Sequence, residues 1–143
     1  MDVDEFVKHV YQRNYQPSER SFLAKNGFVT SYCRGWMTSD GLESEIWLVR
    51  FSTAGEARYE YQSMATNWKR ESEPTVTFAD PAVDGEGATS TKLDSVKKAE
   101  TRIGATLGEM FVYVKTYNPG VPDKAAAMAL IQQQIQLMIR KSR

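Results

Sequence analysis

The stretch that decides the fold runs from Phe28 to Phe51 and reads FVTSYCRGWM-TSDGL-ESEIWLVRF. Its first part, Phe28–Met37, is rich in the β-branched and aromatic residues that favour strands. Thr38–Gly41 has the composition of a turn. Glu43–Phe51 then alternates as a half-buried strand does. Ser44, Ile46 and Leu48 lie on one face, and Glu45, Trp47 and Val49 lie on the other. The stretch therefore predicts an antiparallel hairpin.

Helical patterns lie on both sides of this hairpin. Asp2–Arg13 predicts a short helix, and a second one begins at Pro17 and ends at Asn26-Gly27, where glycine favours a helix stop. Thr53-Ala54-Gly55-Glu56 is a capping box and predicts a helix that continues to about Arg70. Asp123–Arg140 has the strongest helical pattern in the chain, with alanines and large aliphatic residues on one face.

The segment after residue 70 has weaker patterns. Glu71–Pro74 breaks the helical periodicity, and Thr75–Ala79 predicts a short strand. Pro81–Lys92 contains Gly85, Gly87 and several serines and threonines. This composition predicts a mobile loop.

A second hairpin follows that segment. Thr101–Leu107 and Met110–Tyr117 flank Gly108-Glu109, which fits a two-residue turn with glycine first. The whole order is two helices, hairpin, helix, short strand, hairpin and helix. It predicts an α+β fold in which an antiparallel sheet of about five strands carries packed helices, as an α/β/α sandwich. The 143 residues suit one domain over 1–143, since no linker interrupts them.

The composition excludes several classes of function. Eighteen basic residues balance eighteen acidic ones, so the net charge is zero, whereas proteins that bind nucleic acid usually carry a basic excess. We predict no nucleic-acid partner, although basic residues gather at Lys97, Lys98 and Arg102 and at Arg140, Lys141 and Arg143. The single cysteine, Cys33, excludes an internal disulfide and a site with several cysteine ligands. No stretch approaches the ~20 apolar residues of a membrane span, and the first residues lack the pattern of a signal peptide.

Residues that carry chemistry stand apart from one another. His9, the only histidine, is predicted to be an exposed residue, and Cys33 a buried or half-buried thiol without a base beside it. Asp80, Asp84 and Glu86 lack the spacing of a calcium loop. We therefore predict no catalytic residue, no metal site and no cofactor. An enzyme remains the third alternative, and it needs carboxylates that converge only in the fold, such as Glu45, Glu60 or Glu109.

The aromatic residues are the strongest candidates for binding. They are concentrated in the predicted strands and in the helix that follows Phe51. If helices cover both faces of the sheet, these aromatic residues are core residues. The alternative is a groove or dimer surface lined by Trp36, Trp47 and Tyr113, because aromatic patches commonly mark binding sites. Trp36 and Trp47 are predicted to lie near one another across the first hairpin, whether they are core residues or a recognition surface.

Two segments carry a resemblance to known proteins. Ser21–Trp36 and the junction Arg50-Phe51-Ser52-Thr53-Ala54 resemble small secreted or lipid-anchored domains of actinobacteria. In those domains a helix that ends in Gly-Phe leads into a strand with a tryptophan. The order of elements is similar to the α/β/α sandwich of the PsbP and Mog1 group. The resemblance implies an extracytoplasmic binding or assembly module.

These observations predict a non-enzymatic binding or interaction domain outside the cytoplasm, with the cytoplasm as the alternative location. Its partner is a protein or a small apolar ligand, and it is a monomer or a homodimer. A membrane anchor in the native gene stays open. The alternative function is a carrier of a small molecule or lipid, with an apolar pocket between the sheet and the helices.

Overall fold

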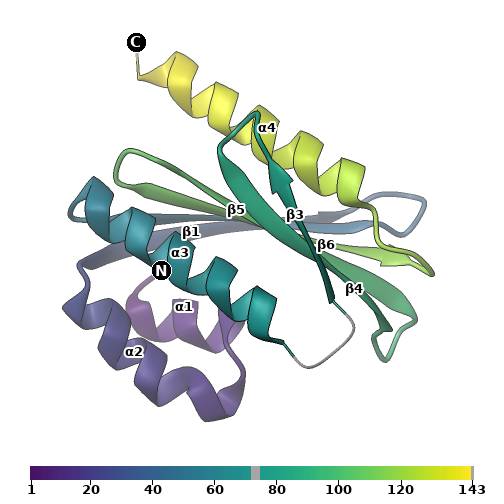
Figure 1. Cartoon of the computed structure of the whole chain (residues 1–143), viewed down its shortest axis with the longest axis horizontal. Coiled ribbons are helices and arrows are strands. Elements are labelled where there is room, and N and C mark those ends of the chain that lie inside the picture. Colours follow the sequence, from purple (N-terminus) through teal and green to yellow (C-terminus); the bar gives the residue numbers. More distant parts are fainter. Residues whose placement is uncertain (72–74, 143) are drawn as a thin grey trace.

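Six strands form one antiparallel sheet in the spatial order β1-β2-β6-β5-β4-β3 (Figure 1). The computed structural model describes residues 1–71 and 75–142. β1 and β2 form the first hairpin, the chain then crosses to the far edge of the sheet, and β3 to β6 return until β6 pairs with β2. The strands are β1 (Phe28–Met37), β2 (Glu43–Phe51), β3 (Thr75–Asp80), β4 (Gly85–Leu93), β5 (Lys98–Leu107) and β6 (Met110–Pro119).

Helices cover both faces of this sheet (Figure 1). Three of them pack on one face: α1 (Val3–Val10), α2 (Gln16–Lys25) and α3 (Ala54–Arg70). The last helix, α4 (Lys124–Lys141), packs on the other face, over β5 and β6. A short 3-10 turn, Arg13–Tyr15, joins α1 to α2. The layers are those that the sequence predicts.

Alternation along the strands divides the core in two, because successive side chains of a strand point to opposite faces. On the α1–α3 face, Trp47 and Phe111 pack with Phe6 and with the buried side of α3. On the α4 face, Ile103 and Val112 of the sheet pack with aliphatic residues of α4. The sheet is therefore buried over much of both faces.

The number of strands differs from the predicted five because the supposed mobile loop is largely β4. Gly85 and Gly87 are buried in this strand. A Cβ atom at Gly87 would lie 2.4 Å from the Arg102 carbonyl oxygen and 2.5 Å from a ring atom of Phe78. The glycines are therefore needed for close approach to β5 and β3, not for a flexible loop. Asp80, which the sequence suggested as an acidic residue next to a solvated loop, is buried and accepts bonds from the Gln132 side chain at 3.1 and 3.2 Å.

The helix boundaries agree with the sequence to within about one residue, except that α1 ends at Val10 and not at Arg13. At the start of α3, the Glu56 backbone N–H donates to Thr53 Oγ1 at 3.1 Å, as the predicted capping box requires. Most of the predicted break over 71–74, and Arg143 of the C-terminal basic group, lie outside the described residues. Within the described residues, no helix is both long enough and apolar enough to cross a membrane.

Candidate functional site

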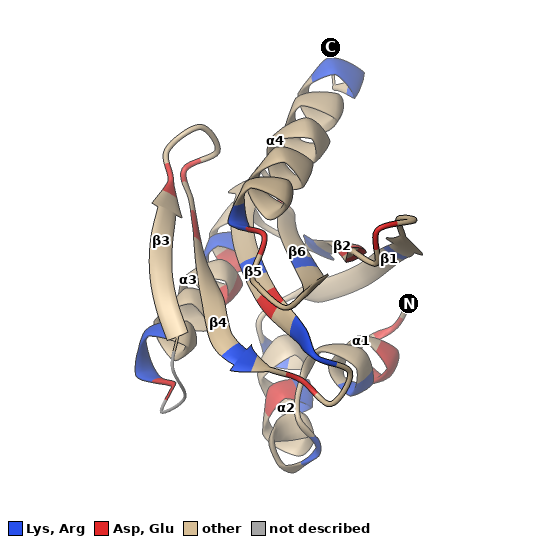
Figure 2. Ribbon diagram, turned by 90° about the vertical axis from the view of Figure 1, so that its right-hand side faces the viewer, with Lys and Arg blue, Asp and Glu red and all other residues tan. Residues whose placement is uncertain are grey.

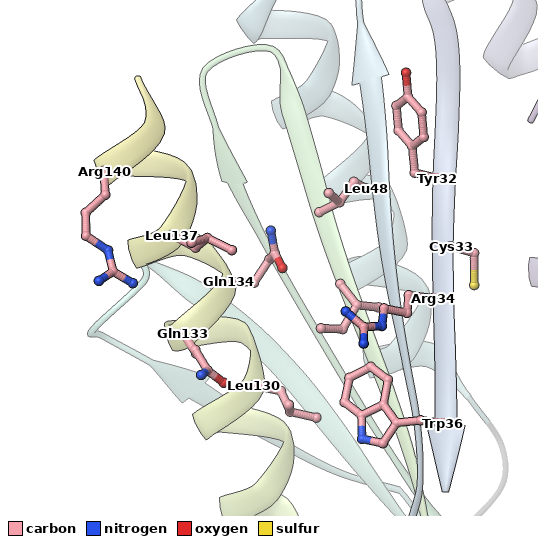
Figure 3. A pocket seen from close by; sticks show the side chains of 11 residues that line it. Tyr32, Cys33, Arg34, Trp36, Leu48, Leu130, Gln133, Gln134, Leu137 and Arg140 are labelled. Carbon is pink, nitrogen blue, oxygen red and sulfur yellow. The ribbon is translucent and has the colours of Figure 1, made fainter. Parts of the chain in front are cut away.

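The position of α4 creates a groove on its face of the sheet. α4 lies over β5 and β6, so that on this face β2 is only partly covered and the edge strand β1 is largely exposed. Between this helix and the hairpin lies a groove of about 500 Å³, which we call the α4 groove (Figure 3). Its volume is in the range of pockets that bind small molecules.

Apolar side chains form most of the groove. Tyr32 pairs with Leu48, and Arg34 pairs with Ile46, in the β1–β2 ladder. Directly paired residues of antiparallel strands point to the same face, and Ile46 and Leu48 pack with the core under α4. Tyr32, Arg34 and Trp36 therefore point to the α4 side, as Figure 3 shows, while Cys33 points away from it. The helix contributes Leu130 and Leu137 to the opposite wall.

The polar groups of the groove are cationic or neutral. They include the guanidinium groups of Arg34 and Arg140, the side-chain amides of Gln133 and Gln134, and the hydroxyl of Tyr32. No Asp or Glu lines the groove in the described part of the chain. Neither arginine has a carboxylate within ion-pair distance among the described residues. The groove thus combines an apolar lining with positive charge that no acid of the described segments neutralises.

Helix α4 adds no negative charge to this environment. Its charged residues are Lys124, Arg140 and Lys141, so charge is confined to its two ends (Figure 2). The Arg34 guanidinium carbon lies 5.8 Å from the centroid of the Trp36 ring, which is within the range of a cation–π contact. This contact keeps the charge of Arg34 beside the apolar lining.

A second cleft, of about 790 Å³, opens on the other face of the sheet between α1, α3 and strands β4 to β6. Trp68 and Tyr113 stack in its wall with ring centroids 6.0 Å apart. Arg102 donates two hydrogen bonds to the carboxylate of Glu71, at 2.8 and 2.5 Å, and lies over the Trp68 ring. The charge of Arg102 in this cleft is therefore already paired, and Glu19, Glu71 and Glu100 also line the cleft, in contrast to the α4 groove.

A buried carboxyl group lies behind this second cleft. Tyr11 lines the cleft, and its hydroxyl donates a 2.5 Å hydrogen bond to Glu60 Oε1. Glu60 is 1% exposed, and its Oε2 has no hydrogen-bond partner in the described part of the chain. Burial raises the pKa of Glu60 to about 8, and the nearby charge of Glu19 adds to the rise, although the bond from Tyr11 lowers it. Glu60 is therefore mainly protonated at neutral pH.

The three predicted binding residues do not form one surface. Trp36 is half-buried and lines the α4 groove, whereas Trp47 and Tyr113 are only 1% and 3% exposed on the opposite face. Trp47 and Tyr113 do pair directly between β2 and β6. The expectation that Trp36 lies near Trp47 is wrong, because Trp36 pairs with Ser44 and Trp47 pairs with Cys33. The two indoles are an odd number of positions apart in this ladder and so point to opposite faces.

The three carboxylates of the enzyme alternative lie on different elements. Glu45 accepts a 3.3 Å bond from the Trp47 indole, and Glu109 forms an ion pair with Arg50 at 3.5 Å. Glu60 is paired with Tyr11. Among the described residues, no hydrogen bond joins any two of these three carboxylates.

The predicted exposure is correct for His9 and wrong for Cys33. His9 is exposed, as predicted, and its Nδ1 lies 2.7 Å from the Glu5 carbonyl oxygen. Cys33 is exposed, not buried or half-buried as predicted, because β1 is at the edge of the sheet. Loss of part of the water around its sulfur, together with the charge of Glu45, raises the pKa of Cys33 to about 11, so its thiol is protonated at neutral pH. Over 1–71 and 75–142, no group of three or more His, Cys, Asp or Glu residues is placed to hold a metal ion.

A solved structure has a similar fold. It is the extracellular domain of PknH from Mycobacterium tuberculosis, with a TM-score of 0.60 and 18% sequence identity. The similarity covers 78% of this chain and 66% of that chain, just under two thirds of the PknH domain. At this identity the likeness shows the fold alone, and the fold is one found in an extracellular actinobacterial domain.

No protein-family model matches the chain. No curated protein sequence matches it either. The specific resemblance to the PsbP and Mog1 group therefore stays a prediction.

Sequence reasoning missed most of the α4 groove. It identified Trp36 but not Arg34, it named Arg140 only in a group of basic residues, and it assigned the aliphatic residues of α4 only to the apolar face of a helix. The absence of acidic residues from all of Asp123–Arg140 after its first residue is the signal that was present in the sequence. A helix without carboxylates does not repel an anionic group that binds beside it.

Proposed function

We propose that this chain is a non-enzymatic, extracytoplasmic binding domain that takes an anionic, apolar ligand into the α4 groove. The ligand class is a hydrocarbon chain with an acidic head group, such as a long-chain carboxylate. The observation that carries this proposal is an apolar lining beside two guanidinium groups that have no carboxylate partner among residues 1–71 and 75–142.

The groove offers such a ligand two kinds of contact, one with its apolar lining and one with its arginines. Apolar surface in the groove loses its contact with water when a hydrocarbon chain covers it, at roughly 25 cal/mol per Å². An acidic head group gains charge-assisted hydrogen bonds from Arg34 or Arg140, and these are about twice as strong as neutral ones. A cationic head group meets repulsion instead. The groove therefore selects by charge as well as by apolarity.

The location outside the cytoplasm is supported by two observations. The chain resembles secreted or lipid-anchored actinobacterial domains over Ser21–Trp36, and its fold is similar to an extracellular domain of an actinobacterial protein. The non-enzymatic part of the proposal is supported by the separation of Glu45 in β2, Glu60 in α3 and Glu109 in the β5–β6 turn.

Binding of laurate, below the concentration at which it forms micelles, tests this function. Calorimetric titration is expected to show binding of laurate and much weaker binding of dodecyltrimethylammonium, which has a chain of the same length and the opposite charge. Arg34→Gln and Arg140→Gln should each weaken laurate binding, by about tenfold for the arginine that holds the head group. Arg13→Gln is the matched control, since Arg13 is exposed and lies outside the groove.

Two outcomes contradict the proposal. Equal binding of the anionic and cationic amphiphiles shows that charge plays no part. No binding of laurate, or binding that neither groove variant changes, shows that the groove is not the site for this ligand class.

A further inference from the structure

Strand β1 leaves part of its hydrogen-bonding capacity unused. It is the outer strand at one end of the sheet. The Ser31 backbone N–H donates to the Met1 carbonyl oxygen at 3.0 Å, and the Ser31 carbonyl accepts from the Met1 amino group at 2.6 Å, so Ser31 points its backbone groups away from β2. Alternate residues of a strand point the same way, and the outward groups therefore continue at Cys33, Gly35 and Met37. No bond to these outward groups is present in the described residues.

This edge also lacks the features that normally prevent strand pairing. Natural edge strands carry lysines, prolines, bulges or short lengths that discourage association. β1 has ten residues, and its single charged residue is Arg34. The only irregularity of its register lies between Phe28 and Thr30, at the far end from Gly35. Tyr32 and Met37 are 60% and 59% exposed, so apolar side chains flank the unpaired backbone.

We propose that a second copy of this chain pairs antiparallel with β1 around a two-fold axis at Gly35. The two sheets then join edge to edge, in an isologous dimer. In this register Gly35 faces Gly35 of the second copy, and Cys33 faces Met37 of the second copy. Each outward backbone group of the free part of β1 thus acquires a partner.

The bonds already present at the edge exclude two neighbouring registers, and a third, with the axis at Trp36, leaves Cys33 opposite a position beyond the end of the partner strand. With the axis at Gly35, Ser31 faces a position beyond the end of the partner strand, so its bonds to Met1 are kept. With the axis at Cys33, Ser31 must pair with Gly35 of the second copy and lose those bonds. With the axis at Arg34, Ser31 loses them as well, and two guanidinium groups also stand directly opposite each other, which is repulsive.

The side chains are complementary in the selected register. Arg34 faces Trp36 of the second copy in a non-hydrogen-bonded pair, where opposite side chains are closest. A guanidinium group over an indole ring is a favourable cation–π contact, and it occurs twice because of the symmetry. On the other face, the sulfur atoms of Cys33 and Met37 meet as soft apolar groups. The zero net charge of the chain adds no long-range repulsion between copies.

The dimer goes beyond the proposed ligand binding and does not depend on it. Because Tyr32, Arg34 and Trp36 point to the α4 side, the α4 grooves of the two copies open on the same face of the joined sheet. The open β1 side of each groove is then bounded by the β1 strand of the second copy.

Sedimentation velocity over a range of protein concentrations tests the dimer. The wild-type chain is expected to shift from monomer to dimer as its concentration rises. Met37→Lys should abolish this shift by placing a charge on the paired edge. Val76→Lys is the matched control, because Val76 is 58% exposed on β3, the strand at the opposite edge of the sheet. A wild-type chain that stays monomeric, or an equal effect of both lysines, overturns the proposal and leaves this edge to a strand of another protein.

Cross-linking tests the register. In the double variant Cys33→Ser with Gly35→Cys, the introduced thiols face each other, and a mild oxidant such as copper phenanthroline should remove one hydrogen from each and join them as a disulfide. A Cβ atom at Gly35 has 3.6 Å to its nearest neighbour, so the substitution fits. In the wild type, the two Cys33 residues lie about 13 Å apart along the strands, too far for a bond. Rapid cross-linking of the wild type with none of the double variant overturns this register.

Discussion

The Tyr11 hydroxyl and the Glu60 carboxyl join the end of α1 to the middle of α3 through a 2.5 Å hydrogen bond. Tyr11→Phe should destabilise the fold by ~1–3 kcal/mol, because a buried acceptor loses its donor while the ring packing stays. Urea unfolding measures this change. Tyr15→Phe is the control, since Tyr15 lines the same cleft but is exposed. Equal stability of the two variants would show that the bond contributes nothing.

Glu60 makes stability depend on pH. Its pKa is raised from the ordinary value of 4.5 to about 8 in the folded chain. Between these pH values the folded protein keeps a proton that the unfolded chain has lost. The folded state therefore binds more protons, and the free energy of unfolding should fall as pH rises from about 4.5 to 8 and then level off. Burial raises the pKa of Glu19 too, which adds a slope of the same sign.

Urea unfolding at several pH values tests this linkage. Glu60→Gln keeps the size of the side chain and removes its titration, so its stability should change less with pH across that window. A variant with the same pH slope as the wild type would assign the dependence to other groups.

The two tryptophans of the first hairpin should respond differently to substitution. Trp47→Ala should destabilise the fold by ~3–5 kcal/mol, because Trp47 fills the core between α1 and the sheet. Trp36→Ala should destabilise it by only ~1–2 kcal/mol, since Trp36 is half-buried. Trp36→Ala should instead weaken laurate binding in calorimetry. The opposite order of stability would place Trp36 in the core.

The glycines of the sheet offer a matched pair. Gly87→Ala should destabilise the fold by ~1–3 kcal/mol or more, because the added methyl group meets the Arg102 carbonyl oxygen at 2.4 Å. Gly35→Ala meets its nearest atom at 3.6 Å and should change stability little. Thermal unfolding of both variants measures the difference, and a tolerated alanine at position 87 would contradict the tight packing of β4 between β3 and β5.

Local sequence patterns were enough to predict the strands whose pairing partners are close in the chain. The alternation in Glu43–Phe51 and the turn at Thr38–Gly41 predict the first hairpin with its observed ends. β4 was missed because glycine, serine and threonine favour loops locally, and only the neighbouring strands and Phe78 explain why glycine is required there.

The candidate site was predicted less well for a related reason. Tyr32 and Arg34 come from β1, whereas Leu130 and Arg140 come from a helix at the other end of the chain. Nothing in their local sequence places them together. The pairing of Trp36 with Ser44 had to be known before Trp36 and Trp47 could be assigned to opposite faces.

The path of the chain through the sheet has a consequence for folding during synthesis. β2 lies between β1 and β6, and β6 is the last strand to leave the ribosome. The β2 edge of the first hairpin therefore stays unpaired until residues 110–119 have emerged. The long sequence separation between β2 and β6 makes the formation of this strand pair slow. Until β6 arrives, the nascent chain has the same exposed strand edge that chaperones protect in other slowly folding sheet proteins.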